Sequence, residues 1–297
     1  MKLLPSVLAI QVILGLALVA LVATDTLPST DGEADGEAGG MFPPRPAVNR
    51  FNGDAAFRLL REQVERGPRP AGSEASRVLA KRLRSLLPGG RFQDVPGGLQ
   101  NVIGTVRGRE PGYIVVGAHY DTKDLPGFVG ANDGASGTAV VTELARTIRR
   151  PRHTVHFILF DGEESPRGTP DADFVEEGLR GSKVAAPVFR DAQAMVLLDF
   201  VGEKRLSILR EGLSSPGLWR RLRAAAERVG VGRVFPPEST VAVQDDHLPF
   251  RQLGVPAIDL IDVTFRCFHR RCDDLSAVSP RSVDAVGETV YELLRTL

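Results

Sequence analysis

The sequence has no net charge, because its 37 basic side chains equal its 37 acidic side chains at pH 7. A chain without an excess of positive charge has no overall attraction for nucleic acid. Its arginine-rich stretches, such as RRPRH at 149–153, are therefore interpreted as solvated loops. The charge balance predicts that nucleic acid is not a partner.

Cysteine is also scarce, with two residues in a chain of 297, and no internal repeat is visible. Hydrophobic residues make up 42% of the chain and charged residues 25%, which is typical of a globular protein with a sizeable core. A single α/β domain often reaches about 250 residues, so we expect one large folded domain.

The first 23 residues, MKLLPSVLAIQVILGLALVALVA, contain one lysine followed by a nearly uninterrupted apolar run. A run of about 20 apolar residues spans a bilayer as a helix and is long for the apolar part of a cleaved signal. Leu21 fits poorly in a cleavage site ending at Ala23, so an uncleaved anchor is favoured, although cleavage stays open. Either case predicts a membrane-anchored or secreted protein whose folded part is extracytoplasmic.

Residues 24–49 are acidic, rich in glycine and proline, and poor in apolar side chains. Such a segment cannot bury enough apolar surface to order itself, so it is predicted to be a flexible linker. The folded domain is expected to comprise residues 50–297.

Within this domain, segments with helical spacing alternate with short apolar runs. The segments GDAAFRLLREQVERG and SEASRVLAKRLRSLL predict two helices that begin with Asp54 and Ser73 as N-caps. Further helices are expected at 135–149, 216–229 and 281–295, and strands at the runs NVIGTV, YIVVGA, VHFILF, AMVLLDF and AIDLI. This order predicts an α/β fold with a mostly parallel central sheet and helices on both faces.

Acidic residues and histidines follow these strands, at the sheet edge where α/β proteins bind ligands. Imidazole and carboxylate groups are the ligands of catalytic zinc. Enough of them are present for one zinc ion, or for two that share a bridging carboxylate. The predicted ligands are His119, Asp133, Glu164, Asp199 and His269. The other histidines, His153, His156 and His247, are expected to serve packing or orientation.

Six motifs carry a family resemblance: GAHYDTK, FVGANDGASG, FDGEES, LLDFVG, QDDHLPFRQLGVP and FHRRCDD. From about residue 55 to the C-terminus the chain resembles the glutaminyl cyclases (glutaminyl-peptide cyclotransferases) and the zinc aminopeptidases of the bacterial leucyl aminopeptidase type. In the cyclases, the positions matching Asp133, Glu164 and His269 hold a single zinc ion. In the aminopeptidases, those matching His119 and Asp199 are ligands too, and the one matching Asp133 bridges two ions.

The resemblance also assigns the proton-transfer residues. Glu163 matches the general acid/base of both branches, and Asp245 matches a cyclase aspartate that forms an acidic cluster with Asp199. In a cyclase, the α-amine of an N-terminal glutamine attacks its own γ-carbonyl, and ammonia leaves. In an aminopeptidase, water attacks the first peptide bond. Peptide or protein N-termini are the expected substrates in both cases.

The motif QDDHLPF and the long stretch between Glu164 and Ser182 favour the cyclase branch. Phe268, however, stands where cyclases have a tryptophan, and the stretch after Glu164 has Phe174 as its only aromatic residue. Phe128, Phe265 and Phe268 are expected to form an apolar wall. The residues predicted to contact substrate are Gln244, Phe265 and Phe268.

Two alternatives stay open. Cys267 and Cys272 flank His269 and are expected to form a disulfide in an exported protein, but free thiols or additional metal ligands are also compatible with the spacing. A metal-free binding ectodomain is a further possibility for this fold, although the presence of all five ligands and Glu163 argues against it.

Overall fold

The computed structural model of the chain describes residues 42–297. The predicted membrane helix at 1–23, and most of the predicted linker at 24–49, lie outside these residues. Within the described range, no helix has both the length and the apolar character needed to cross a bilayer.

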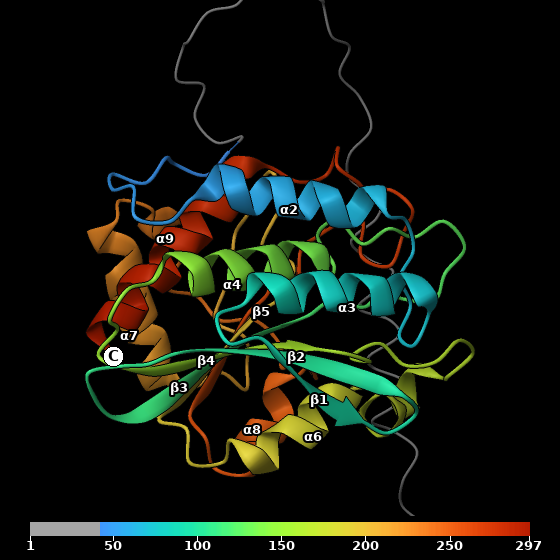
Figure 1. The fold of residues 1–297 in the computed structure, drawn as a ribbon. Coiled ribbons are helices and arrows are strands. Elements are labelled where there is room, and N and C mark those ends of the chain that lie inside the picture. The colour runs from blue at the N-terminus through green and yellow to red at the C-terminus, as the bar shows by residue number, and fades with distance from the viewer. Residues whose placement is uncertain (1–41) are drawn as a thin grey trace, which may run out of the picture. The chain divides into compact units, whose positions relative to one another are not determined.

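A six-stranded sheet with the order β1-β2-β4-β3-β5-β6 forms the centre of the fold (Figure 1). Four neighbouring strands, β4, β3, β5 and β6, run parallel to one another, whereas β2 runs antiparallel to both β1 and β4. The prediction of a mostly parallel sheet is therefore confirmed. The strands are β1 (Arg91–Val95), β2 (Leu99–Val106), β3 (Glu110–His119), β4 (His153–Phe160), β5 (Ala194–Leu198) and β6 (Ala257–Leu260).

The central strands are buried because their sequences are apolar on both faces. All five residues of β5 are buried, as are the last six residues of β3. Neighbouring side chains alternate between two cores: Val116 and Val196 belong to the larger core, and Val115 and Met195 to the smaller one. A strand covered on both sides reads as a continuous apolar run, which is why these strands were recognisable.

Helices cover both faces of the sheet, as predicted. The larger core lies under α2, α3, α4, α7 and α9, and the smaller core lies between the sheet and the short helices α6 and α8 (Figure 1). The helices that cover the sheet are α2 (Gly53–Glu65), α3 (Glu74–Leu86), α4 (Ala135–Thr147), α6 (Arg180–Val188), α7 (Pro216–Arg228), α8 (His247–Gln252) and α9 (Pro280–Thr296). Shorter helical turns are η1 (Asp171–Asp173), α5 (Phe174–Glu177) and η2 (Gly232–Val234).

One of the two predicted helix caps is confirmed and the other is wrong. Ser73 caps α3, since its side chain accepts a hydrogen bond from the N–H of Ser76. Helix α2 is capped by Asn52, whose side chain accepts from the N–H of Ala55 at 3.0 Å, and Asp54 lies within the first turn. The first helical residue is Gly53 despite the weak helix propensity of glycine, and a Cβ atom there would approach the side chain of Asp284 on α9 to 2.6 Å.

Candidate functional site

Two groups of side chains that could hold a metal ion lie at the carboxyl ends of the parallel strands. The first consists of His119, Asp133 and Asp199, and the second of Asp133, Glu164 and His269. In each group the potential ligand atoms all lie within 4.8 Å of one another. The structure thus brings together all five ligands predicted from the sequence, and Asp133 belongs to both groups.

The strand ends explain this convergence. His119 is the last residue of β3, and Asp199 directly follows β5. Asp133 ends the loop before α4, where Gly134 has a φ of 82°. This is the left-handed region that glycine occupies at no steric cost. A Cβ atom on Gly134 would also approach the carbonyl of Asp121 to 2.7 Å, so the tight turn that presents Asp133 requires glycine.

The distances within the groups suit a shared cation. Nε2 of His119 lies 3.2 Å from Asp133 Oδ1 and 3.3 Å from Asp199 Oδ1. Nε2 of His269 lies 3.4 Å from Asp133 Oδ2 and 3.3 Å from Glu164 Oε1. These three carboxylates are almost completely buried, and neither Asp133 Oδ2 nor Glu164 Oε1 has a hydrogen-bond partner among the described residues. Buried carboxylates need a compensating charge, and histidine with carboxylate is the ligand set of catalytic zinc, so the residues fit that metal.

His119 is surrounded by acidic groups on all sides. Its Nδ1 lies 3.6 Å from Asp121 Oδ1, opposite the contacts of Nε2 with Asp133 and Asp199. Burial disfavours the charged imidazole, but the close carboxylates of Asp121, Asp133 and Asp199 outweigh it and raise the pKa of His119 well above its ordinary value. A positive charge at this position, carried by a proton or by a metal ion, is therefore strongly favoured.

Asp121 also orients the segment DGEES, which sequence reasoning did not foresee. Its carboxylate accepts hydrogen bonds from the N–H groups of Glu163 and Glu164, both at 3.3 Å. The carbonyls of the same two residues accept from Leu179 N–H and from the Arg180 guanidinium. Because hydrogen bonds hold this backbone on both sides, the directions of the Glu163 and Glu164 side chains are fixed.

The two adjacent glutamates have different environments. Glu164 is paired with Lys123, whose Nζ lies 3.0 Å from Oε2. Burial alone would raise the pKa of Glu164, but its close contact with the His269 imidazole and the charge of Lys123 lower it. Burial and the charge of Glu164 raise the pKa of Glu163 well above its ordinary value. The structure therefore keeps Glu164 ionised and favours a proton on Glu163.

More carboxyl groups extend the acidic region behind Glu163. Burial raises the pKa of Asp199 to about 7, and burial also raises that of Asp245. Asp245 and Asp246, which raise the pKa of Glu163 through their charge, are both buried. A proton can thus be held in this region near neutral pH, as a general acid/base requires.

Asp273, four residues after His269, holds the loop that carries Asp133. Its two carboxylate oxygens accept hydrogen bonds from the N–H groups of Asn132 and Asp133, at 2.7 Å and 3.0 Å. Asp273 is fully buried, and burial with the nearby charge of Asp133 raises its pKa to about 8. Asp273 is the first aspartate of the motif FHRRCDD, whose spacing alone does not indicate this contact with the loop of Asp133.

Arg69 is a second supporting residue that the sequence did not reveal. Its buried guanidinium donates to the carbonyls of Tyr120, Val129 and Gly130, at 3.1, 2.6 and 3.0 Å. These carbonyls belong to the segments that present His119 and Asp133. Burial lowers the pKa of Arg69 to about 10, which leaves the side chain charged at neutral pH.

The remaining histidines lie outside both groups. His153 hydrogen-bonds to the carbonyl of Pro111, and His156 contacts the hydroxyl of Thr105, as expected for packing residues. His247 is fully buried and lies between two carboxylates, 3.4 Å from Glu211 and 3.8 Å from Asp259.

Aromatic residues surround His269. Phe268 stacks on its ring with a centroid distance of 3.9 Å, and Phe128 meets it edge-on at 6.1 Å. Phe268 is 54% exposed, whereas Phe128 and Phe265 are buried. Of the predicted apolar wall, Phe268 therefore presents most of the accessible surface, and Phe265 supports it through Phe200. Gln244, also predicted to contact substrate, is exposed on the loop before α8.

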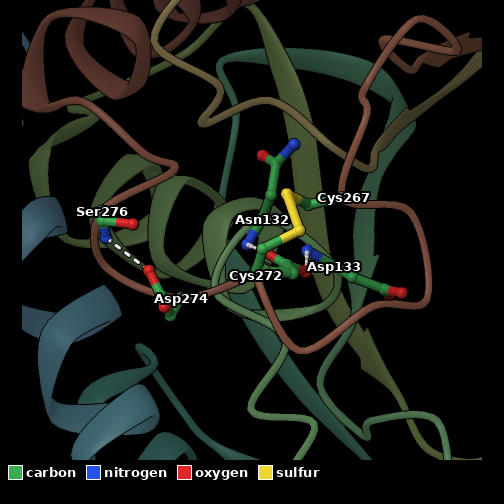
Figure 2. The surroundings of a disulfide bond; sticks show 7 residues. Asn132, Asp133, Cys267, Cys272, Asp274 and Ser276 are labelled. Atoms are coloured by element: carbon green, nitrogen blue, oxygen red, sulfur yellow. Dashed lines mark hydrogen bonds between the residues drawn. A yellow bond between two sulfur atoms is a disulfide. The ribbon is translucent and has the colours of Figure 1, made fainter.

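The cysteines form a disulfide, Cys267–Cys272, with a Cα–Cα distance of 5.4 Å (Figure 2). The bridge flanks His269, as the sequence led us to expect. Free thiols and extra metal ligands, the two alternatives, are thereby excluded for this state of the chain.

Comparison with known proteins agrees with this geometry. Residues 101–294 match Peptidase family M28. The glutaminyl-peptide cyclotransferase of Bothrops jararaca is 27% identical over 282 residues, which covers 76% of this chain and 75% of the relative. Among solved structures, the glutaminyl cyclase of Porphyromonas gingivalis is 28% identical with a TM-score of 0.72, over 84% of this chain and 99% of the other. A leucine aminopeptidase precursor from Bacteroides thetaiotaomicron is 26% identical with a TM-score of 0.74, and the match covers 85% of this chain and 99% of the other. The chain belongs to peptidase family M28.

Proposed function

We propose that this chain is a zinc-dependent glutaminyl-peptide cyclotransferase, which converts an N-terminal glutamine to pyroglutamate and releases ammonia. The observation that carries the chemistry is the division between Glu164 and Glu163. One is an ionised member of a metal-binding group, and the other is a buried carboxyl that favours its proton. The choice of the cyclase branch is supported by the named cyclases among the relatives and by the motif QDDHLPF.

Asp133, Glu164 and His269 would hold the zinc ion on which this reaction depends. A bound zinc ion would act as a Lewis acid that polarises the γ-carbonyl group of the glutamine. Lys123 and Asp273 support this group, because Lys123 pairs with Glu164 and Asp273 holds the backbone of Asp133.

Glu163 would move the proton. An N-terminal ammonium first loses one proton to solvent to become the free amine; as its nitrogen attacks the γ-carbon it must lose a second proton, which Glu163, when ionised, would accept. After the new C–N bond closes the ring, Glu163 would return a proton to the departing amide nitrogen, which leaves as ammonia. The peptide loses one ammonia, and no solvent oxygen enters the product.

The acidic residues behind Glu163 would set its pKa for both proton transfers. The charges of Asp245 and Asp246 raise the pKa of Glu163, whereas a nearby positive charge such as that of His119 lowers it. Burial and these carboxylate charges keep the pKa of Glu163 raised, which suits a group that accepts and donates a proton in one cycle.

A zinc aminopeptidase is the second candidate, and one observation favours it. The first group, His119, Asp133 and Asp199, is complete and shares Asp133 with the second group, which is the arrangement needed for two ions. In that case Glu163 would be the base that activates water, and the product would be a free N-terminal amino acid.

We further propose that the protein is exported. The apolar run at 1–23 would anchor the catalytic domain to a membrane or direct its secretion, and 24–49 would link the two. N-terminal sequencing of the mature protein tests this, since a start near residue 24 indicates cleavage and an intact Met1 in a membrane fraction indicates an anchor. An intact protein in the cytoplasm would contradict both.

A paired assay separates the two activities. The zinc-loaded protein is incubated with a peptide that begins with glutamine and, separately, with a leucine amide. Ammonia release from the peptide without cleavage of its backbone supports the cyclase. Free leucine from the amide, with no ammonia from the peptide, would replace it with the aminopeptidase.

A further inference from the structure

The segment Cys267–Asp273 lies between β6 and α9 and carries the metal-binding residue His269. The disulfide joins Cys267 to Cys272, so His269 sits inside a closed loop (Figure 2). Two backbone hydrogen bonds fold the loop: Arg270 N–H donates to the carbonyl of Cys267, and Asp273 N–H donates to that of Arg270.

His269 has an unusual backbone conformation within this loop. Its φ is +51°, in the left-handed region that residues other than glycine seldom occupy. An unconstrained chain would rarely adopt it, so the direction of the imidazole depends on the loop that surrounds it. The disulfide supplies that constraint directly, because its two ends lie on either side of His269.

The next residue after the bridge contacts the other metal-binding segment. Asp273 accepts hydrogen bonds from three consecutive N–H groups: its carbonyl from Ala131, and its carboxylate from Asn132 and Asp133. Cys272 is bonded to Asp273 along the chain, and Figure 2 shows the disulfide beside Asn132 and Asp133. One short segment therefore fixes His269 at one end and the backbone of Asp133 at the other.

We propose that the disulfide Cys267–Cys272 and Asp273 form one positioning unit that sets His269 relative to Asp133, so that metal affinity depends on the oxidation state of the two cysteines. The inference rests on the proposed function only in that these residues bind a metal. A dithiol would reduce the bridge by donating two electrons and two protons, which gives two cysteine thiols and oxidises the dithiol to a disulfide. Cys272 is exposed, so such a reductant can reach it.

The first test substitutes Asp273→Asn, with Asp274→Asn as a matched control. Asp274 is the adjacent aspartate, but its carboxylate accepts a hydrogen bond from Ser276 N–H, away from the metal groups (Figure 2). Residues that orient a metal ligand typically contribute about 10- to 100-fold to metal affinity, so Asp273→Asn should weaken zinc binding by that factor. Asp274→Asn should bind zinc like the original protein, in a competition titration with a coloured chelator.

Melting temperatures separate positioning from general stability. In a positioning role, Asp273→Asn reduces the increase in melting temperature caused by zinc more than it lowers the melting temperature of the metal-free protein. Equal lowering with and without zinc, at unchanged zinc affinity, would show that Asp273 is only structural and would overturn the proposal.

The second test needs no substitution and therefore does not depend on a variant folding. The disulfide is reduced, both thiols are alkylated with iodoacetamide, and the reagents are removed before zinc is titrated. Because the chain has two cysteines, alkylation changes no other cysteine. We expect zinc affinity to fall about 10-fold or more. Unchanged affinity would overturn the proposal, and since no peptide is present, failure of the proposed cyclase activity would leave this result intact.

Discussion

Replacing Glu163 by glutamine should greatly slow turnover while the protein keeps its metal. Glutamine has nearly the same shape as glutamate, and the backbone of residue 163 is held by Asp121 on one side and Leu179 on the other. The substitution therefore removes a proton carrier without moving its neighbours. Glu163 belongs to neither metal-binding group, so zinc content should be unchanged.

The size of the effect follows from the role. A positioned general acid/base contributes about a hundredfold to ten-thousandfold to the rate. At about 1.4 kcal/mol for each factor of ten, Glu163→Gln should raise the activation barrier by about 3 to 5 kcal/mol. The variant should be at least as stable as the original protein, because burial and the charge of Glu164 disfavour an ionised carboxylate at this position and glutamine is uncharged.

The control is Glu164→Gln, one residue away. This change removes a side chain that offers Oε1 to the second metal-binding group and Oε2 to Lys123, so zinc should be lost together with activity. The measurements are ammonia release from a glutaminyl peptide and zinc content by atomic emission. Equal loss of zinc from both variants, or a normal rate for Glu163→Gln, would refute the division of roles between the two glutamates.

Three further predictions concern stability. Arg69→Met leaves three backbone carbonyls near the metal groups without their donor, so the free energy of unfolding in urea should fall by at least about 3 kcal/mol; a loss below about 1 kcal/mol would contradict this. Burial and the charge of Asp262 raise the pKa of Glu203 from 4.5 to about 7, so the fold loses stability as pH rises through this window. Chemical denaturation should show that Glu203→Gln is as stable as the original protein at pH 4 and more stable by about 1 to 2 kcal/mol at pH 8, a value reduced to allow for the partial exposure of Glu203. Excess zinc at about 100 times its dissociation constant should stabilise the fold by about 2.7 kcal/mol relative to chelator-treated protein, measured by the fluorescence of the single tryptophan, Trp219; identical unfolding curves would rule out a metal site.

The parts of the fold that could be predicted are those whose sequence reports burial directly. The strands β3 and β5 are apolar along their buried length, and α4, α7 and α9 show helical spacing with clear ends. Strand β1 was missed because its sequence, RFQDV, is mostly polar and exposed at the sheet edge. Helix α8 was missed because it spans six residues and contains a proline, which leaves too little periodicity to detect.

The same distinction applies to the site. His119, Asp199 and Glu164 were found because they follow apolar strands, whose ends meet at one edge of a parallel sheet. Arg69 and Asp273 could not be assigned, because their importance lies in contacts between loops that are distant in sequence. Nothing in the local sequence around Arg69 indicates that its guanidinium reaches carbonyls about 50 to 60 residues further along the chain.

The most direct test of the account is a reaction in water labelled with the heavy oxygen isotope. The zinc-loaded protein is incubated with a peptide that begins with glutamine, and the mass of the product is measured by mass spectrometry. Cyclisation by the peptide's own amine predicts a product lighter by one ammonia that carries no labelled oxygen. Labelled oxygen in any product would mean that water is the nucleophile, and the cyclase function proposed for this chain would be wrong.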